Sequence, residues 1–414
     1  MDPIPLSLPF LLDGATGTEL QKRGMPQGVC TEQWALAHPD ALLELQRGYV
    51  DAGAAVLVTP TMGANRGALE KFGLQDHMEA YNRELTALTR RAAGGRALVA
   101  GDLGPTGLAI PPYGDTPFEL LVGVYAEQAR VLDLAGVDLF LVESVMAMAE
   151  ARAAVLGIRE SGSDKPILVT CYCDEEGRTP TGTDVLACAI VMQGMGVAAF
   201  GLNCVDAEVA GEQLARLHQY TDLPLIAEPS AGLPELVEGR PAYVDNAGDF
   251  ARRVPQWAAA GVRIFGGCCG THAGHIAALK GAMDRVDFAS FPAVEKDPDV
   301  IPCASEKEAR FITPDVDVGE TIECAPDLVE RILEAEEERP VGALKIAVLE
   351  EDDLQIFAEE QYAVRDALCI WSDVPELMEG ALRAYQGRAF YDGTADLEPE
   401  FLAEMSRKYG LILL

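Results

Sequence analysis

The stretch Ala260-Gly261-Val262-Arg263-Ile264-Phe265-Gly266-Gly267-Cys268-Cys269-Gly270 joins a helix end, a short apolar run and a pair of cysteines. A glycine just after a helix supplies the left-handed conformation of a C-cap. The apolar run lacks polar alternation, as expected of a strand that is buried on both faces. The stretch therefore predicts a helix, a glycine cap and a buried strand, with two cysteines where the strand ends.

The same pattern returns at Ala52-Gly53, Ala135-Gly136 and Met195-Gly196, each followed by an apolar run. The strands expected from such runs are Pro9–Asp13, Ala54–Pro60, Ala97–Asp102, Val137–Glu143, Pro166–Cys171, Val197–Cys204, Leu223–Glu228 and Val262–Cys269. Helical periodicity fills the gaps between them. Eight βα units within about 285 residues match the count and length of a TIM barrel.

A doubly wound open sheet is the rival architecture. It would more often have fewer strands and a glycine-rich phosphate turn after the first one. Here the first strand is followed by Asp13-Gly14-Ala15-Thr16-Gly17-Thr18, which does not fit G-x-G-x-x-G. The sequence therefore favours a (β/α)8 barrel over residues 1–285.

The composition changes after the barrel segment. Residues 286–340 are rich in Pro, Glu and Asp, and we expect an acidic linker with one helix, Pro326–Glu338. Apolar runs and helical periodicity resume over residues 341–414, which predicts a small α/β unit.

The chain of 414 residues carries a net charge of −34, because acidic residues outnumber basic ones by 66 to 32. This charge disfavours a nucleic-acid or anionic-membrane partner, since both are polyanions. The sequence contains no uncharged apolar stretch long enough to predict a membrane span. The N-terminus lacks the basic region and the long apolar core of a signal peptide. We expect a cytoplasmic protein whose ten cysteines remain thiols.

Cys204, Cys268 and Cys269 each follow a predicted strand, which makes them a candidate cage for one soft metal ion. Three thiolates suit Zn²⁺, and the lack of an evident fourth ligand indicates an open, catalytic site. Such a centre carries a net charge of −1, so it is a poor Lewis acid but can hold a substrate thiol as a fourth thiolate. The chemistry expected is alkyl transfer to sulfur. The alternative is that these cysteines are small apolar core residues.

Asp13 and Glu143 also end barrel strands, where carboxylates can bind a substrate ammonium group. Their alternative role is a strand cap or a structural ion pair. Asn203 lies beside Cys204 and either serves the site or satisfies backbone groups. Cys171 and Cys173 are interpreted as spare thiols.

Several segments resemble the zinc-dependent homocysteine S-methyltransferases, a family that includes the homocysteine-binding module of cobalamin-dependent methionine synthase and betaine–homocysteine methyltransferase. The resemblance covers residues 8 to about 285 in order. It is carried by Leu12–Thr18, Thr59–Arg66, Gly101–Gly107, Val142–Ser144 with Glu150-Ala151, Gly201–Cys204 and Gly266–Thr271.

The resemblance implies a TIM barrel with zinc on Cys204, Cys268 and Cys269 and the homocysteine sulfur as fourth ligand. It also implies that Asp13 and Glu143 bind the amino-acid end of homocysteine, in a substrate site that includes Asn203, Gly14 and Thr16. The product would be methionine. Departures from the family pattern lie near the substrate mouth, at Ser144, Pro60, Met62 and Asp102.

The last unit faintly resembles part of the pterin-binding barrel that follows the homocysteine module in cobalamin-dependent methionine synthase. It is too short to close a barrel, so we interpret it as a truncated relic used for packing, homodimer formation or docking. Because the chain has no D-x-H-x-x-G corrinoid motif, the expected methyl donor is a methylcorrinoid protein in trans. The alternatives are a free donor such as S-methylmethionine or betaine, or a non-catalytic subunit that binds homocysteine and zinc.

Overall fold

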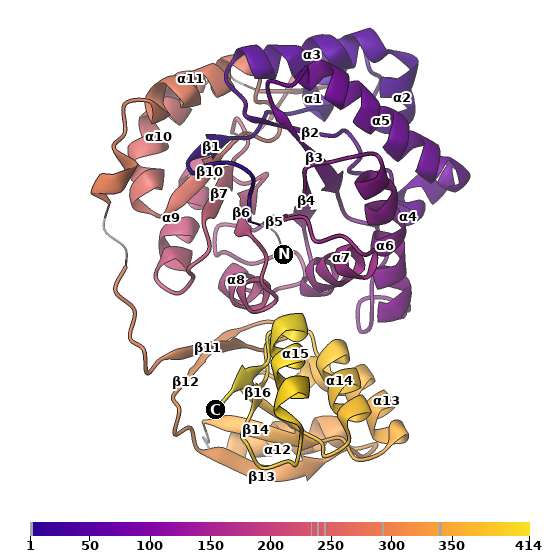
Figure 1. Cartoon of the computed structure of the whole chain (residues 1–414), viewed down its shortest axis with the longest axis vertical. Helices are drawn as coiled ribbons and strands as arrows, with labels where there is room; N and C mark the ends of the chain where they lie inside the picture. The colour runs from indigo at the N-terminus through magenta and orange to yellow at the C-terminus, as the bar shows by residue number, and fades with distance from the viewer. Residues whose placement is uncertain (1–2, 233, 238–239, 244–245, 292–293, 339–341) are drawn as a thin grey trace.

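The computed structural model describes all residues except 1–2, 233, 238–239, 244–245, 292–293 and 339–341. The chain forms a barrel with a smaller unit beside it (Figure 1). The barrel sheet is parallel, with strand order β1-β10-β7-β6-β5-β4-β3-β2. Its strands are β1 (Phe10–Leu11), β2 (Val56–Val58), β3 (Leu98–Leu103), β4 (Leu139–Val145), β5 (Ile167–Cys171), β6 (Ala199–Asn203), β7 (Leu225–Glu228) and β10 (Val262–Phe265).

The barrel closes between its first two strands, where the Ala55 amide donates to the Leu11 carbonyl at 2.9 Å. The predicted (β/α)8 barrel is therefore confirmed, with each predicted strand at its expected place. The helices around the sheet are α1 (Gly17–Lys22), α2 (Thr31–Ala37), α3 (Pro39–Asp51), α4 (Arg66–Glu70), α5 (Met78–Ala93), α6 (Phe118–Leu134), α7 (Met148–Glu160), α8 (Val185–Gly194), α9 (Ala207–His218), α10 (Ala247–Ala259) and α11 (Ala273–Met283).

Inward-facing side chains fill the barrel with a core of its own. Alternate residues of the strands point to the axis, among them Leu12, Val56, Leu141, Leu168 and Ile226, all completely buried. The outward-facing residues pack under the helices. Because the apolar layer lies below the carboxyl ends of the strands, the polar residues that end the strands are left to form the mouth.

A short two-stranded antiparallel sheet is inserted in the last third of the barrel. The antiparallel strands β8 (Glu235–Val237) and β9 (Arg240–Ala242) lie between β7 and α10. Neither strand was predicted from the sequence, because both are only three residues long.

The smaller unit contains a parallel sheet with strands in chain order, β13 (Val318–Glu323), β14 (Ala343–Ala347), β15 (Leu368–Trp371), β16 (Phe390–Tyr391) and β17 (Ile412–Leu413). Its helices are α12 (Leu328–Glu338), α13 (Glu351–Glu360), α14 (Pro375–Ala384) and α15 (Pro399–Tyr409). A hairpin, β11 (Ile301–Ala304) and β12 (Ala309–Ile312), packs its Cys303 and Ile312 against Cys369 and Phe390 of this sheet.

Residues 286–340 therefore differ from the acidic linker that we expected. They supply the hairpin, the edge strand β13 and the predicted helix α12. The edge strand escaped the sequence analysis because acidic and polar residues alternate with its few apolar ones, as is common at an exposed sheet edge. The extents 1–285, 286–340 and 341–414 stay a proposal for the domain boundaries.

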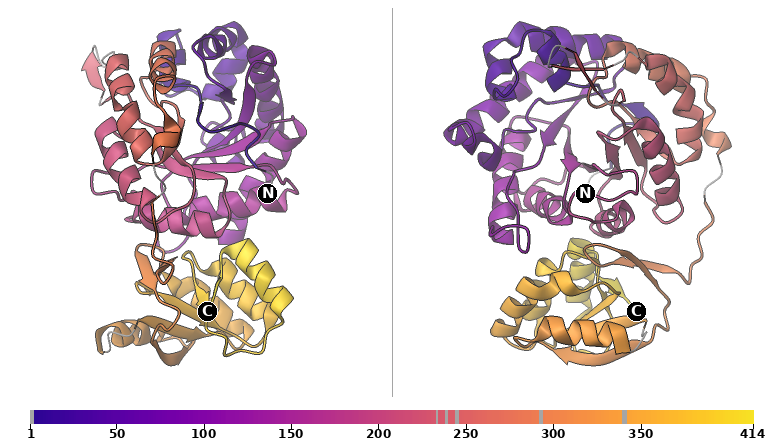
Figure 2. Two further views of the ribbon diagram at one scale, coloured as in Figure 1. Left: turned by 60° about the vertical axis from the view of Figure 1, so that its left-hand side comes forward. Right: turned by 180° about the vertical axis from the view of Figure 1, so that it is seen from behind.

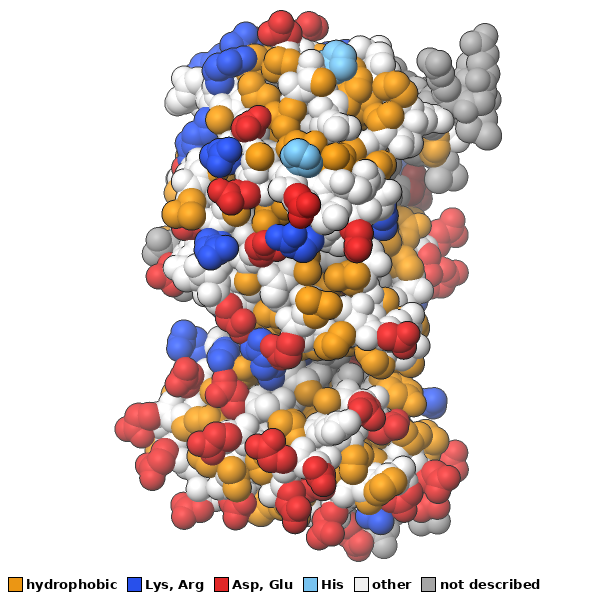
Figure 3. All heavy atoms as spheres, turned by 90° about the vertical axis from the view of Figure 1, so that its right-hand side faces the viewer, with side chains coloured by type: hydrophobic (Ala, Val, Ile, Leu, Met, Phe, Trp, Pro, Cys, Tyr) orange, Lys and Arg blue, Asp and Glu red, His pale blue; other side chains and the backbone are white. Residues whose placement is uncertain are grey.

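The smaller unit packs against α7 and α8 of the barrel (Figure 2). Arg152 of α7 is fully buried there, and burial lowers its pKa to about 10. Its guanidinium donates to the carbonyls of Leu382 (2.9 Å) and Arg383 (3.1 Å) at the end of α14. Acidic side chains gather on the outer face of the smaller unit (Figure 3). Among the described residues no helix is long and apolar enough to cross a membrane.

Replacing Arg152 with alanine should destabilise the protein by about 3 kcal/mol. The substitution opens a cavity and leaves two buried carbonyls at the end of α14 without their hydrogen-bond donor. Urea unfolding measures this loss. The control is Arg407→Ala, which removes an exposed arginine of the smaller unit and should change stability by less than about 0.5 kcal/mol. Equal unfolding midpoints for the two variants would show that Arg152 does not join the units.

Candidate metal and substrate site

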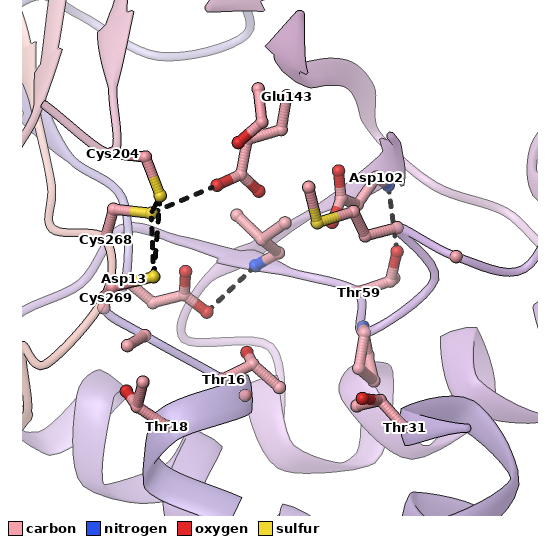
Figure 4. Close-up of a pocket in the computed structure, with 18 of the residues that line it drawn as sticks. Asp13, Thr16, Thr18, Thr31, Thr59, Asp102, Glu143, Cys204, Cys268 and Cys269 are labelled. Carbon is pink, nitrogen blue, oxygen red and sulfur yellow. Dashed lines mark hydrogen bonds between the residues drawn. The ribbon is translucent and has the colours of Figure 1, made fainter. Parts of the chain in front are cut away.

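Three cysteine sulfurs meet at the carboxyl end of the barrel (Figure 4). Cys204 follows β6 directly, and Cys268 and Cys269 follow β10 after two glycines. The Sγ atom of Cys204 lies 2.6 Å from that of Cys268 and 3.5 Å from that of Cys269, and the last two are 4.0 Å apart. The structure thus brings together the three predicted metal ligands, from strands separated by β7.

The backbone holds the cysteines by specific hydrogen bonds. The amide of Cys204 donates to the Glu228 carbonyl at 3.2 Å, and that of Cys268 donates to the Pro229 carbonyl at 3.0 Å. Cys204 has φ 58°, in the left-handed region that non-glycine residues rarely occupy. Such strain is typical of functional sites, where the surrounding structure enforces it.

The glycine before the pair permits a close approach to Thr271. An added Cβ on Gly267 would lie 2.6 Å from the Thr271 hydroxyl oxygen. That hydroxyl donates to the Cys268 carbonyl at 2.7 Å and accepts from the Ala15 amide at 3.1 Å. Thr271 therefore fixes the cysteine loop to the loop that carries Asp13.

The donor set fits a soft metal ion. Zinc–sulfur bonds of 2.3 Å place tetrahedral sulfurs about 3.8 Å apart. Two of the three separations here bracket that value, and Cys204 and Cys268 would have to separate by about 1 Å. Hydrogen bonds from Cys204 and Cys268 lower the pKa of Cys269 to about 3, so one of the thiols is poised as a thiolate.

Two carboxylates, one buried and one half-buried, lie beside the sulfurs. The half-buried Glu143 lies near the end of β4, and its Oε1 atom accepts from Asn203 Nδ2 at 2.9 Å and lies 3.9 Å from the Cys268 sulfur. Burial raises the pKa of Glu143 to about 7. Asp13 follows β1 and accepts from the Val58 amide at 3.0 Å, and burial raises its pKa well above the usual value.

Asn203 connects the carboxylate to the cysteine loop. Besides Glu143, its Nδ2 lies 2.6 Å from the Ser144 hydroxyl oxygen and 3.9 Å from the Cys268 sulfur. Its Oδ1 accepts from the Ser144 amide at 3.2 Å. Ser144 has φ 59°, so the side chain of Asn203 supports a second strained residue at the mouth.

The three cysteines, Asp13, Glu143 and Ser144 line one cavity of about 550 Å³. Asn203, a predicted substrate-site residue, is not part of this lining and contacts the site through its hydrogen bond to Glu143. Gly14 and Thr16, both predicted site residues, are part of its wall. Gly14 leaves room for Tyr49, since an added Cβ would lie 2.9 Å from the tyrosine ring. Among the described residues that line the cavity, none has a basic side chain.

Three further carboxylates line the cavity that the sequence did not single out as site residues, Glu32, Asp102 and Glu228. Asp102 and Glu228 are 3% and 4% exposed, and each has one oxygen without a hydrogen-bond partner, Oδ1 and Oε2 respectively. Burial raises the pKa of both well above the usual value. Their place at strand ends was visible in the sequence, but it could not show that they share a cavity with Glu143.

A second chamber of about 390 Å³ adjoins the first. Both chambers include Cys204, Cys269, Ser144 and Met62 in their walls. The second is otherwise lined by loop residues, including Met146, Tyr172 and Tyr243. The ring of Tyr243 rests where a side chain on Gly270 would be, 2.3 Å from an added Cβ.

The spare thiols and the two histidines that follow the cysteine pair lie outside the lining of both chambers. Cys171 is fully buried next to the thiol of Cys188, and Cys173 is buried as well. His272 and His275 form a capping box at the start of α11. Among the described residues, the group able to hold a metal ion is Cys204, Cys268 and Cys269.

Known proteins of one family match this chain. The family model described as homocysteine S-methyltransferase matches residues 10–283. The methionine synthase of Mycobacterium leprae (strain TN) is 30% identical over 305 residues, which cover 69% of this chain and 25% of the relative. That of Mycobacterium tuberculosis (strain ATCC 25618 / H37Rv) is 30% identical over 293 residues, or 66% and 24%. The matched segment thus spans about a quarter of these relatives.

Solved structures agree with this match. The metallated form of the homocysteine methyltransferase MmuM from Escherichia coli has a TM-score of 0.57 and 28% sequence identity, and covers 66% of this chain and 95% of that chain. Its oxidized form gives a TM-score of 0.55. From the extent of the family match, and from the site that it encloses, this chain belongs to the homocysteine S-methyltransferase family.

Proposed function

We propose that this protein is a zinc-dependent methyltransferase that moves a methyl group to the sulfur of homocysteine and forms methionine. The observation that carries the proposal is the meeting of three cysteine sulfurs with buried carboxylates in one cavity. Sulfur ligands suit zinc, and carboxylates suit the ammonium group of an amino acid. Membership of the family supports the acceptor.

Cys204, Cys268 and Cys269 would hold the zinc ion. An ion held there would supply a lowered pKa to the homocysteine thiol, which would then be available as a thiolate nucleophile. Three cysteine thiolates leave the centre with net negative charge, so the acceptor sulfur stays electron-rich. In the transfer, the new sulfur–carbon bond forms as the bond from the methyl group to the donor breaks, and that bonding pair leaves with the donor.

Asp13 and Glu143 would bind the ammonium end of homocysteine. Asp13 is buried and Glu143 half-buried in a cavity whose described lining has no basic side chain, so an incoming ammonium is the natural counter-charge. Asn203 holds Oε1 of Glu143 from one side, which leaves the rest of the carboxylate for the substrate. Gly14 and Thr16 complete the wall around this end.

For the donor, we propose first a methylcorrinoid protein supplied in trans. The curated relatives are methionine synthases, and this chain matches a quarter of their length. A small cationic donor such as S-methylmethionine or betaine is the second candidate, favoured by the acidic cavity. MmuM, which the chain matches over 95% of its length, supports methyl transfer by a barrel of this size.

A donor screen with homocysteine as acceptor tests the function. The zinc-loaded full chain is mixed with homocysteine and either a methylcorrinoid protein, S-methylmethionine or betaine, and methionine is measured. Methionine formed with one of these donors supports the enzyme and identifies the donor class. If homocysteine binds but none of the donors gives methionine, the protein is instead a non-catalytic subunit that binds homocysteine and zinc.

We expect about one zinc ion per chain by elemental analysis, as one three-thiolate site requires. Cys268→Ser should lose the metal, because a hydroxyl is a poor ligand for zinc in place of a thiolate. Cys324→Ser is the control, since Cys324 is a partly exposed free cysteine of the smaller unit. Zinc retained at full stoichiometry by Cys268→Ser would argue against the assigned ligands.

Glu143→Gln should raise the KM for homocysteine severalfold, because it keeps the size of the side chain and removes its charge from the ammonium site. Zinc content should remain at the wild-type level. The control Glu127→Gln alters a surface carboxylate that pairs with Arg66. An unchanged KM in Glu143→Gln would remove this residue from the acceptor site.

A further inference from the structure

Hydrogen bonds connect the loops that follow β3, β4 and β5 across the mouth of the barrel. The hydroxyl of Thr181 donates to the Met146 carbonyl at 3.2 Å, and the hydroxyl of Tyr113 donates to the Thr181 carbonyl at 3.2 Å. Met146 and Tyr172, from the loops after β4 and β5, line the second chamber. The shape of this chamber therefore depends on how the three loops are held.

The turn between β11 and β12, residues 305–308 of the smaller unit, contacts two of these loops. Arg178, in the loop after β5, donates through Nη1 and Nη2 to the two carboxylate oxygens of Glu308 at 2.8 and 3.1 Å. The Lys307 carbonyl accepts from the Asp184 amide at 2.9 Å and from Arg178 Nη1 at 3.2 Å. The Lys307 ammonium lies 4.7 Å from the ring centroid of Tyr113, in the loop after β3.

Hydrogen bonds and close packing fix the turn to the rest of the smaller unit. Ser305 is completely buried, and its hydroxyl accepts from the Glu308 amide at 3.1 Å. Ala304 and Arg388 exchange backbone hydrogen bonds at 2.8 and 3.4 Å. Even Gly387 fits closely, since an added Cβ there would lie 2.1 Å from the Ala304 carbonyl oxygen. A turn fixed in this way can transmit the position of the smaller unit to the barrel loops.

We propose that the β11–β12 turn of the smaller unit is a positioning element for the second chamber, and that this chamber receives the methyl donor. The donor part rests on the proposed function: the acceptor's amino-acid end occupies the first chamber with Asp13 and Glu143, and the second chamber shares Cys204 and Cys269 with it. A donor in the second chamber can thus reach a sulfur held at the cysteines.

The bonds made by the turn form a network rather than one ion pair. A single half-exposed ion pair contributes at most about 1 kcal/mol. Here a bidentate pair, two hydrogen bonds to a backbone carbonyl and a cation–π contact act on the same two loops. These contacts together hold the two loops against the turn, and none of them involves the three cysteines.

Glu308→Gln and Glu308→Arg test the positioning role in the full chain. Glu308→Gln keeps the shape and weakens the pair, whereas Glu308→Arg repels Arg178. The control Asp366→Asn breaks the Arg310–Asp366 pair, whose exposure is similar but which lies within the smaller unit. Hydrogen exchange of residues 104–117 and 172–184 should quicken severalfold in Glu308→Arg, less in Glu308→Gln, and stay unchanged in Asp366→Asn.

Kinetics with the donor found by the screen test the chamber's role. The KM for the donor should rise severalfold in Glu308→Arg, while zinc content and the KM for homocysteine stay at wild-type values. Unchanged exchange in both loops would overturn the positioning role, whichever donor is used and even if no donor is turned over. Quickened exchange with an unchanged donor KM would overturn the assignment of the donor to the second chamber.

Discussion

The site depends on the parallel register of three neighbouring strands, β10, β7 and β6. In this register Phe265 of β10 and Leu202 of β6 both pair with Ala227 of β7. The carboxyl ends of β10 and β6 therefore lie at the same height on either side of β7. Cys204 and the pair Cys268–Cys269 follow these ends and come together beyond β7. There the Cys204 amide donates a hydrogen bond to the Glu228 carbonyl. A slip of any one of these strands would separate the sulfurs, so the meeting of the three cysteines depends directly on the strand register.

The charge of the mouth follows from the same architecture. Four strand ends place Asp13, Asp102, Glu143 and Glu228 in one cavity, where burial raises each pKa. Burying carboxylates without basic partners is costly, and two of their oxygens have no donor within the described structure. A ligand that brings positive charge into this cavity would therefore stabilise the folded protein on binding.

The sequence was sufficient for the barrel and for the cysteines, because both have strong local signals. Helix, glycine and buried strand repeat along the chain, and Cys268-Cys269 lies between glycines at a strand end. Other features depend on distant contacts and left no local signal. The second chamber is lined by Tyr172 and Tyr243, which come from loops far apart in the sequence. The edge strand β13 resembled an acidic linker because half of its residues are exposed to solvent.

The central claim is that the three cysteines hold zinc and that homocysteine binds to it through sulfur. X-ray absorption at the zinc edge, recorded with and without homocysteine, tests this claim most directly. We expect three cysteine sulfurs around zinc in the protein alone and a fourth sulfur at the same bond length when homocysteine is added. A zinc shell that homocysteine leaves unchanged, or one dominated by nitrogen and oxygen, would contradict it.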